Sequence, residues 1–157
     1  MYEKLGDLLA NSNLEFDRFM YMVGFINTID DFDPNFTLKE GSKLLLKVVA
    51  TKNSAVLELL IRKGANVDGM NAKGATALHI TAFWGCTESL QYLIKCGAEV
   101  NFLSNGASAL DKAMSKKHED CVRILKEAGA LSGAEIQSKG VQNGFDPEIR
   151  QKLYSNK

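Results

Sequence analysis

The feature that most constrains this chain is an internal repeat. Three glycines, Gly41, Gly74 and Gly106, each precede a Gly-Ala pair by 23 residues, and they are spaced by 33 and then 32 residues. The pairs are Gly64-Ala65, Gly97-Ala98 and Gly129-Ala130. A period of about 20–50 residues is typical of solenoids and other repeat arrays. We therefore expect the chain to fold as a stack of similar units.

Each unit carries two apolar stretches at helical spacing. In the middle unit the first runs through Ile80–Trp84 to Gly85, and the second runs through Leu90–Ile94 to Gly97. Thr76 is a suitable N-cap for the first helix, and Gly97 suits the left-handed residue that ends the second. One unit is too short to bury its own apolar face, so the stripe of Leu90, Leu93 and Ile94 must be covered by neighbouring units.

The middle unit also carries a recognisable motif. Thr76-Ala77-Leu78-His79 stands where ankyrin repeats have Thr-Pro-Leu-His, with alanine in place of the usual proline. The chain therefore resembles the ankyrin-repeat family, whose unit is a turn plus two helices. The resemblance implies an all-α solenoid of about four helix-turn-helix units. Their expected bounds within a repeat domain of residues 1–131 are about 2–35, 36–68, 69–101 and 102–131.

The two ends depart from the repeat pattern. The first unit is degenerate: we expect a long capping helix over Phe16–Ile29, followed by a repeat junction at Asp33-Pro34-Asn35. Residues 132–157 are predicted to be a linker followed by a short C-terminal helix or tail. Residues 131–144 have few apolar anchors, and Asp146-Pro147 is a typical helix start. By the resemblance, Lys126 occupies a position that usually holds an inward leucine, so the last helix presents charge at the end of the stack.

Composition excludes several classes of partner. Lysine plus arginine equals aspartate plus glutamate, 19 of each, so no overall charge attracts nucleic acid. No apolar run approaches the length of about 20 residues that a membrane span requires, and the N-terminus lacks a signal-peptide pattern. The cysteines Cys86, Cys96 and Cys121 have no metal-ligand spacing, which favours free thiols over a disulfide. These features predict a cytoplasmic protein with no nucleic-acid or membrane partner.

The sequence also argues against catalysis. Asp31–Thr37 imitates the start of a calcium-binding loop, but Phe36 and Ser42 replace the glycine and glutamate that such a loop needs. Neither histidine lies in a nucleophile motif. The resemblance implies that His79 joins neighbouring units by hydrogen bonds, whereas His118 is expected at a solvated helix start. We predict no catalytic residue, no metal and no cofactor. Asn101 lies in a pattern that resembles the substrate of an asparaginyl hydroxylase, although the same residues are the repeat consensus.

The strongest candidate for a binding surface is the pair Phe83-Trp84. By the resemblance, these two positions vary and face the concave groove, and the flanking units carry Ala50-Thr51 and Ser115-Lys116 there. Exposed apolar clusters mark contact sites, and tryptophan is enriched among binding hot spots. The alternative is that both rings fold onto neighbouring helices and fill a local gap. The predicted partner-binding residues are Phe83, Trp84, Met70, Lys73, Phe102, Leu103, Thr51 and Lys116, with Met70, Phe102 and Leu103 expected near the projecting turn tips.

These observations predict a protein-interaction module that is monomeric when unbound. It would bind a folded partner through the concave face and the turn tips, as an inhibitor, immunity or adaptor protein. Two alternatives remain open at this point. One is an enzyme or small-ligand-binding protein that uses the groove, which would need an acid, a base and a nucleophile on one face. The other is a structural protein that self-associates through the C-terminal helix.

Overall fold

The computed structural model describes Gly24, Ile26, Thr28, residues 32–35, Thr37, and residues 43–50 and 54–139. The helices with bounds in these residues are α3 (Leu44–Ala50), α4 (Ser54–Arg62), α5 (Ala77–Trp84), α6 (Thr87–Lys95), α7 (Ala109–Ser115), α8 (Glu119–Glu127) and α9 (Gly133–Ser138). The only extended pairings within these ranges are isolated bridges, Thr37 with Lys43 and Ser104 with Ala107. The predicted all-α repeat solenoid is confirmed.

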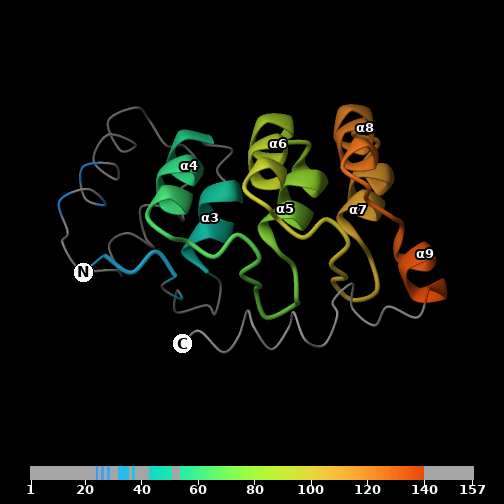
Figure 1. The fold of residues 1–157 in the computed structure, drawn as a ribbon, viewed down its shortest axis with the longest axis horizontal. Helices are drawn as coiled ribbons and strands as arrows, with labels where there is room; N and C mark the ends of the chain where they lie inside the picture. Colours follow the sequence, from blue (N-terminus) through green and yellow to red (C-terminus); the bar gives the residue numbers. More distant parts are fainter. Residues whose placement is uncertain are drawn as a thin grey trace.

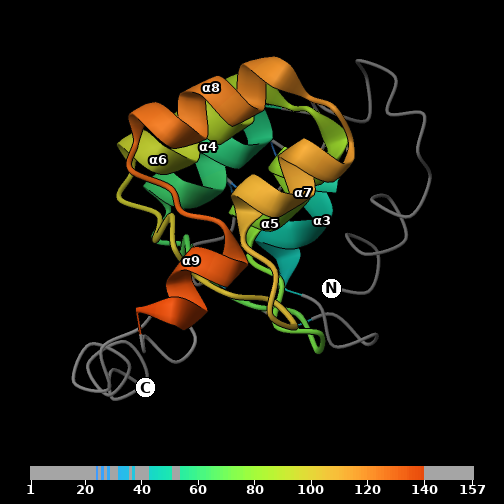
Figure 2. The same ribbon diagram turned by 90° about the vertical axis from the view of Figure 1, so that its right-hand side faces the viewer.

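The helices form two layers that run along the stack (Figure 1). Inner helices α3, α5 and α7 contact one another in that order, and outer helices α4, α6 and α8 do the same. Within each unit the inner helix also contacts its outer partner. Seen along the stack, the two layers lie side by side and α9 lies at one end, below α7 and α8 (Figure 2). We call the side formed by α3, α5 and α7 the inner-helix face.

Leucines at helical spacing hold the layers together, as the repeat pattern predicts. Leu57 and Leu60 of α4, Leu90 and Leu93 of α6, and Leu125 of α8 are all fully buried. Because residues three apart lie on one side of a helix, each pair presents a continuous apolar stripe. The core therefore extends through successive units, and each unit is stabilised mainly by its neighbours.

A ladder of side chains joins each turn to the next. Asn35 Oδ1 accepts the Asn66 backbone N–H at 2.7 Å, Asp68 Oδ1 accepts that of Glu99 at 3.0 Å, and Asn101 Oδ1 accepts that of Leu131 at 2.8 Å. These three acceptors are spaced at the repeat period. The junction predicted at Asp33-Pro34-Asn35 thus performs the same structural task as the later turns.

The N-terminal unit is described only in part. Gly24, Ile26 and Thr28 are helical, and Ile26 is fully buried. The Thr28 hydroxyl donates to the Gly24 carbonyl at 2.9 Å, as in a helix. The rest of the capping helix predicted over Phe16–Ile29, like the helix predicted after Asp146, lies outside the described residues.

The prediction of a linker directly after residue 131 is wrong, because Gly133–Ser138 forms α9. Ser132 caps this helix: its hydroxyl accepts the Glu135 N–H, and its own N–H donates to Glu135 Oε2 at 2.8 Å. Ile136 is 2 % exposed, so α9 is anchored rather than free. The Ser-x-x-Glu capping box was the available signal, and it outweighs the low apolar content of the segment.

Candidate functional site

An aromatic pair and a lysine meet at the C-terminal end of α5. The Phe83 and Trp84 ring centroids lie 5.2 Å apart, with the ring planes almost perpendicular at 85°. Lys116, the C-cap of α7, places its Nζ 4.4 Å from the centroid of the Phe83 ring. Trp84 is 51 % exposed, and Phe83 is half-buried. We call Phe83, Trp84 and Lys116 the aromatic cluster.

In this arrangement Trp84 provides the most exposed ring surface of the cluster. Edge-to-face ring packing and the cation over the Phe83 ring are both favourable interactions that hold the phenylalanine in place. Trp84 packs against Phe83 on one side and keeps about half of its surface in water. A large aromatic surface held on a supported ring is suited to receive an apolar group from another molecule.

His118 fixes the backbone beneath the cluster. Its Nε2 lies 3.0 Å from the Phe83 carbonyl oxygen, and because that oxygen can only accept, Nε2 carries the proton. The residue is half-buried and is the N-cap position of α8. His118 thus lies at a helix start, as predicted, but its imidazole is only partly solvated, because it joins the last two units at the end of α5.

Gly85 offers a test of this contact. The residue has a φ of +69°, and a Cβ there would lie 2.7 Å from His118 Nδ1. Gly97 has a φ of +86° but no atom within 4 Å of the Cβ position. Both replacements by alanine place Cβ in a left-handed conformation, which costs about 1–2 kcal/mol. We expect Gly85→Ala to lower the free energy of unfolding by at least about 1 kcal/mol more than Gly97→Ala, because it also displaces a hydrogen-bonded ring.

Urea unfolding of both variants measures this difference. Equal losses would mean that the His118 ring moves aside without consequence and does not support the end of α5.

Two apolar side chains at a turn tip are buried, whereas the prediction had them exposed. Phe102 and Leu103 are only 8 % and 7 % exposed, so the expectation that they extend an exposed apolar surface is wrong. The Phe102 ring packs edge-on against His79 at 6.3 Å, and Ser104 Oγ donates to the Lys73 carbonyl of the preceding turn at 3.1 Å. These contacts hold the segment against the stack, which covers its side chains.

The other predicted binding residues are distributed more widely. Lys73 is exposed and Met70 is half-buried, both in the turn before α5, whereas Thr51 lies outside the described residues. Among the predicted residues that the structure describes, Phe83, Trp84 and Lys116 meet in one cluster.

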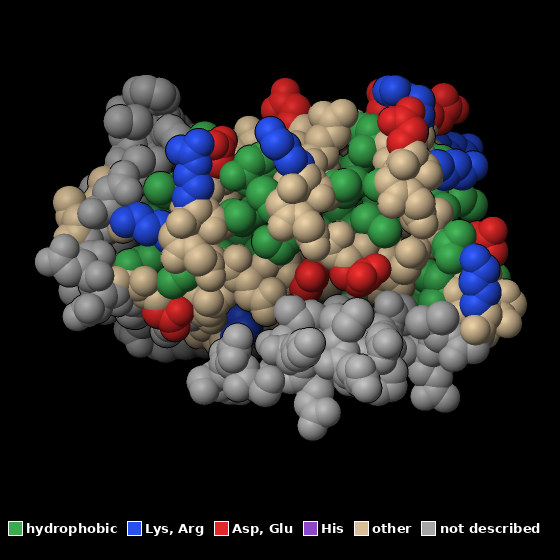
Figure 3. All heavy atoms as spheres, viewed as in Figure 1, with side chains coloured by type: hydrophobic (Ala, Val, Ile, Leu, Met, Phe, Trp, Pro, Cys, Tyr) green, Lys and Arg blue, Asp and Glu red, His purple; other side chains and the backbone are tan. Residues whose placement is uncertain are grey.

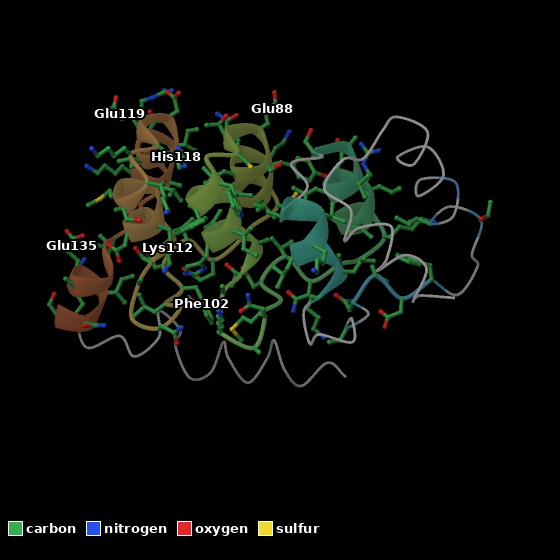
Figure 4. The ribbon with its side chains drawn as sticks, turned by 180° about the vertical axis from the view of Figure 1, so that it is seen from behind. Glu88, Phe102, Lys112, His118, Glu119 and Glu135 are labelled. Carbon is green, nitrogen blue, oxygen red and sulfur yellow. The ribbon has the colours of Figure 1, made fainter. Side chains whose placement is uncertain are left out.

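Sequence reasoning missed two residues beside the cluster. Ile80 and Lys112 lie four positions before Trp84 and Lys116, so each lies one helical turn away on the same side of its helix. Both are half-buried. Lys112 is seen among the inner helices in Figure 4, which views the stack from that side. The i, i+4 spacing was the signal that could have found them.

His79 has the structural role that the repeat motif implies. Thr76, the N-cap of α5, places its hydroxyl 2.9 Å from His79 Nδ1, and Nε2 lies 3.3 Å from the Ala107 carbonyl oxygen of the next unit. Burial lowers the pKa of His79 to about 4, even though hydrogen bonds to backbone carbonyls act in the opposite direction. The imidazole is therefore neutral near pH 7 and joins two units.

Other groups also have a shifted pKa. Burial raises the pKa of Asp68 in the turn ladder and that of the Cys121 thiol in α8. A surface hollow of about 600 Å³ lies at the end of the stack, lined by Met114, Lys117, Glu119, Val122, Arg123, Lys126 and Glu127. Its lining contains no serine, cysteine, threonine or histidine. Within the described residues, no group of three or more His, Cys, Asp or Glu could hold a metal ion.

The fold and these contacts define a class, the helical-repeat solenoids whose units are joined through a buried histidine and a ladder of turn side chains. A family model described as ankyrin repeats (3 copies) matches residues 20–103 and 44–139. The chain belongs to the ankyrin-repeat family. Ankyrin repeats are general protein-interaction modules, and the fold is typically non-enzymatic.

Similar proteins carry the repeat within much longer chains. A potassium channel of Arabidopsis thaliana, AKT2/3, is 36 % identical over 133 residues, which cover 84 % of this chain and 14 % of the channel. Human ankyrin repeat and SOCS box protein 3 is 39 % identical over 82 residues, covering 50 % of this chain and 16 % of that protein. The mouse RelA-associated inhibitor is 30 % identical over 105 residues, covering 64 % and 13 %. The chain thus spans less than a fifth of each of these relatives. In the described part of the chain, no helix has the length and apolar character needed to cross a membrane.

Proposed function

We propose that this chain binds a folded protein partner through the inner-helix face, with the aromatic cluster at the centre of the contact. The observation that carries the proposal is the exposure of Trp84, which keeps 51 % of its surface accessible although it ends a helix packed on both sides. Burying such a surface against a partner provides a favourable free energy of about 25 cal/mol per Å² of apolar area. Tryptophan is also enriched among residues that dominate binding energy.

The details of the stack support a binding role over catalysis. The rings of the cluster are held by protein contacts and by the His118 hydrogen bond, so little ordering is needed on association. The hollow at the end of the stack is lined by charged side chains with Met114 and Val122, and this lining contains no serine, cysteine, threonine or histidine. An inhibitor or adaptor role fits this picture, and one relative is itself named as an inhibitor.

The same proposal includes the setting in which the chain acts. We place it in the cytoplasm as a monomer, where Cys86, Cys96 and Cys121 stay reduced. The spacing of these cysteines along the chain favours thiols over a disulfide, and Cys96 is exposed on the surface, which supports a reducing compartment. The balance of charge supports a protein partner over nucleic acid.

Trp84→Ala tests the site. Because the indole would be buried on association, we expect its removal to weaken binding by at least about 2 kcal/mol, or roughly thirtyfold in Kd. The free energy of unfolding should change much less than it does for a fully buried leucine, since half of the ring is already in water. The partner would be captured on the full chain, and its affinity then measured by calorimetry with purified components.

Met114→Ala is the matched control. Met114 is 50 % exposed, nearly the same fraction as Trp84, but it lines the end hollow and lies outside the cluster. Its removal should leave the affinity unchanged. If Trp84→Ala instead lowers the free energy of unfolding as much as loss of a buried leucine does, and the folded variant binds with full affinity, the ring is a packing residue and the site assignment fails.

A further inference from the structure

The inner-helix face has an apolar centre flanked by cations. Helix α5 contributes Ile80, Phe83 and Trp84, and it lies between α3 and α7. Lys112 of α7 and its C-cap Lys116 lie on one side, while Lys47 of α3 lies on the other. Lys47 and Lys112 occupy the same repeat position as Ile80, so the three residues form a row across the inner helices.

Acidic residues of the described helices lie almost entirely elsewhere. The outer helices carry both signs, with the carboxylates Glu58, Glu88, Glu119, Asp120 and Glu127. Figure 3 shows acidic and basic side chains together on this outer side. Among the inner helices α3, α5 and α7, Asp111 is the single acidic residue.

The carboxylate of Asp111 accepts hydrogen bonds from the backbone. Its Oδ2 accepts the Ser108 N–H at 2.9 Å and the Gly133 N–H at 2.7 Å, and it thereby joins the cap of α7 to the start of α9. These hydrogen bonds direct the Asp111 carboxylate towards backbone N–H groups at the starts of α7 and α9. Within the described residues, the inner helices therefore carry more lysines than carboxylates, whereas the outer helices carry both signs.

We propose that the inner-helix face recognises an acidic segment of the partner protein that carries an apolar anchor. This inference rests on the proposed function and adds the chemistry of the partner. The anchor packs on Trp84 and Ile80, and carboxylates next to it, on the α7 side, meet Lys112 and Lys116. Charge complementarity of this kind sets specificity and the rate of association more than it sets affinity.

The chemistry of the face favours a protein segment over a nucleic acid. The cations flanking the aromatic residues are lysines, and the inner helices carry no arginine, the residue most suited to bidentate contacts with phosphate. A strand of nucleic acid would also extend past the few lysines towards surfaces that carry carboxylates. A short acidic segment matches both the size and the sign of the basic area.

The experiment selects peptides from a random phage-displayed library on the full chain and measures the selected synthetic peptides by fluorescence. Trp84 is the only tryptophan in the chain, so its emission reports directly on occupancy of the cluster. We expect selected peptides to carry Asp or Glu beside a large apolar residue and to change this emission. Versions with Asn and Gln in place of Asp and Glu should bind at least about tenfold more weakly, and the acidic versions should weaken as salt is added.

Charge reversal on the protein provides the matched comparison. The double variant Lys112→Glu, Lys116→Glu should weaken an acidic peptide by at least about tenfold. The double variant Lys95→Glu, Lys126→Glu makes the same change of net charge at exposed positions of α6 and α8, and it should bind within about twofold of the unchanged chain. Circular dichroism and thermal unfolding verify that each variant is folded. Equal weakening by both variants would overturn the proposal, since it would show only a general effect of net charge.

The remaining outcomes distinguish a failure of the proposed acidic partner from a failure of the proposed binding site. Because Trp84→Ala has no tryptophan, its affinity for each peptide is measured by calorimetry. Neutral or basic peptides that change the Trp84 emission and lose affinity with Trp84→Ala would overturn the acidic chemistry and leave the proposed function intact. Peptides that leave the emission unchanged and bind Trp84→Ala equally well would overturn both. An oligouridine that occupies the cluster at lower concentration than the acidic peptides would overturn the inference in favour of a nucleic acid.

Discussion

Replacing Leu93 with alanine is expected to lower the free energy of unfolding by about 2–5 kcal/mol, the usual range for a buried leucine. Leu93 is fully buried on α6, which contacts α4 on one side and α8 on the other. Its side chain belongs to the core that runs through successive units, and truncation leaves a cavity that the close-packed helices cannot fully collapse. Urea unfolding with a two-state fit measures the loss.

Gln91→Ala on the same helix is the control. Gln91 is exposed two positions before Leu93, and its replacement should change the free energy of unfolding by no more than about 0.5 kcal/mol. A loss below about 0.5 kcal/mol for Leu93→Ala as well would show that inter-unit packing contributes little at this position.

The second large effect is a loss of stability in acid through His79. The pKa of this side chain is lowered from 6.5 to about 4 in the folded protein, mainly by burial, and the side chain is 3 % exposed. The unfolded chain therefore takes up a proton at a higher pH than the folded chain does. Stability from the neutral imidazole is complete above pH 6.5 and is lost as the pH falls towards 4. With one pKa unit equivalent to about 1.4 kcal/mol, the full loss is about 3 kcal/mol.

Comparison with His79→Gln isolates this contribution. Carboxylates, including Asp68 with its raised pKa, titrate in both proteins, whereas the imidazole titrates only in the original chain. A glutamine amide can still donate to the Ala107 carbonyl, although the variant will be less stable at neutral pH. We expect its free energy of unfolding to fall less steeply between pH 6.5 and 4, by about 3 kcal/mol over the range. Parallel curves for the two proteins would mean that His79 is protonated in the folded state without penalty.

The stack of helices could be predicted because its signals are local and repeated. Capping residues such as Thr76, the leucines at helical spacing and the glycines at helix ends each act within a few residues, and their recurrence specifies the same unit each time. The place of Phe83 and Trp84 at the end of α5 followed from the same register. The role of His79 followed from the motif, because a histidine at that position of the unit reaches the next unit.

Tertiary structure alone decided which turn residues are covered and which residues meet. The buried Phe102 ring packs against His79, and the nearby Ser104 donates to the Lys73 carbonyl of the preceding turn, which is about one repeat away in the sequence. His118 supports Phe83 across 35 positions of the chain, and Lys116 reaches the same phenylalanine from the next unit. Periodicity determines the side of a helix on which a residue lies, but exposure and charge at a site depend on the neighbouring unit, whose side chains differ at each step of the repeat.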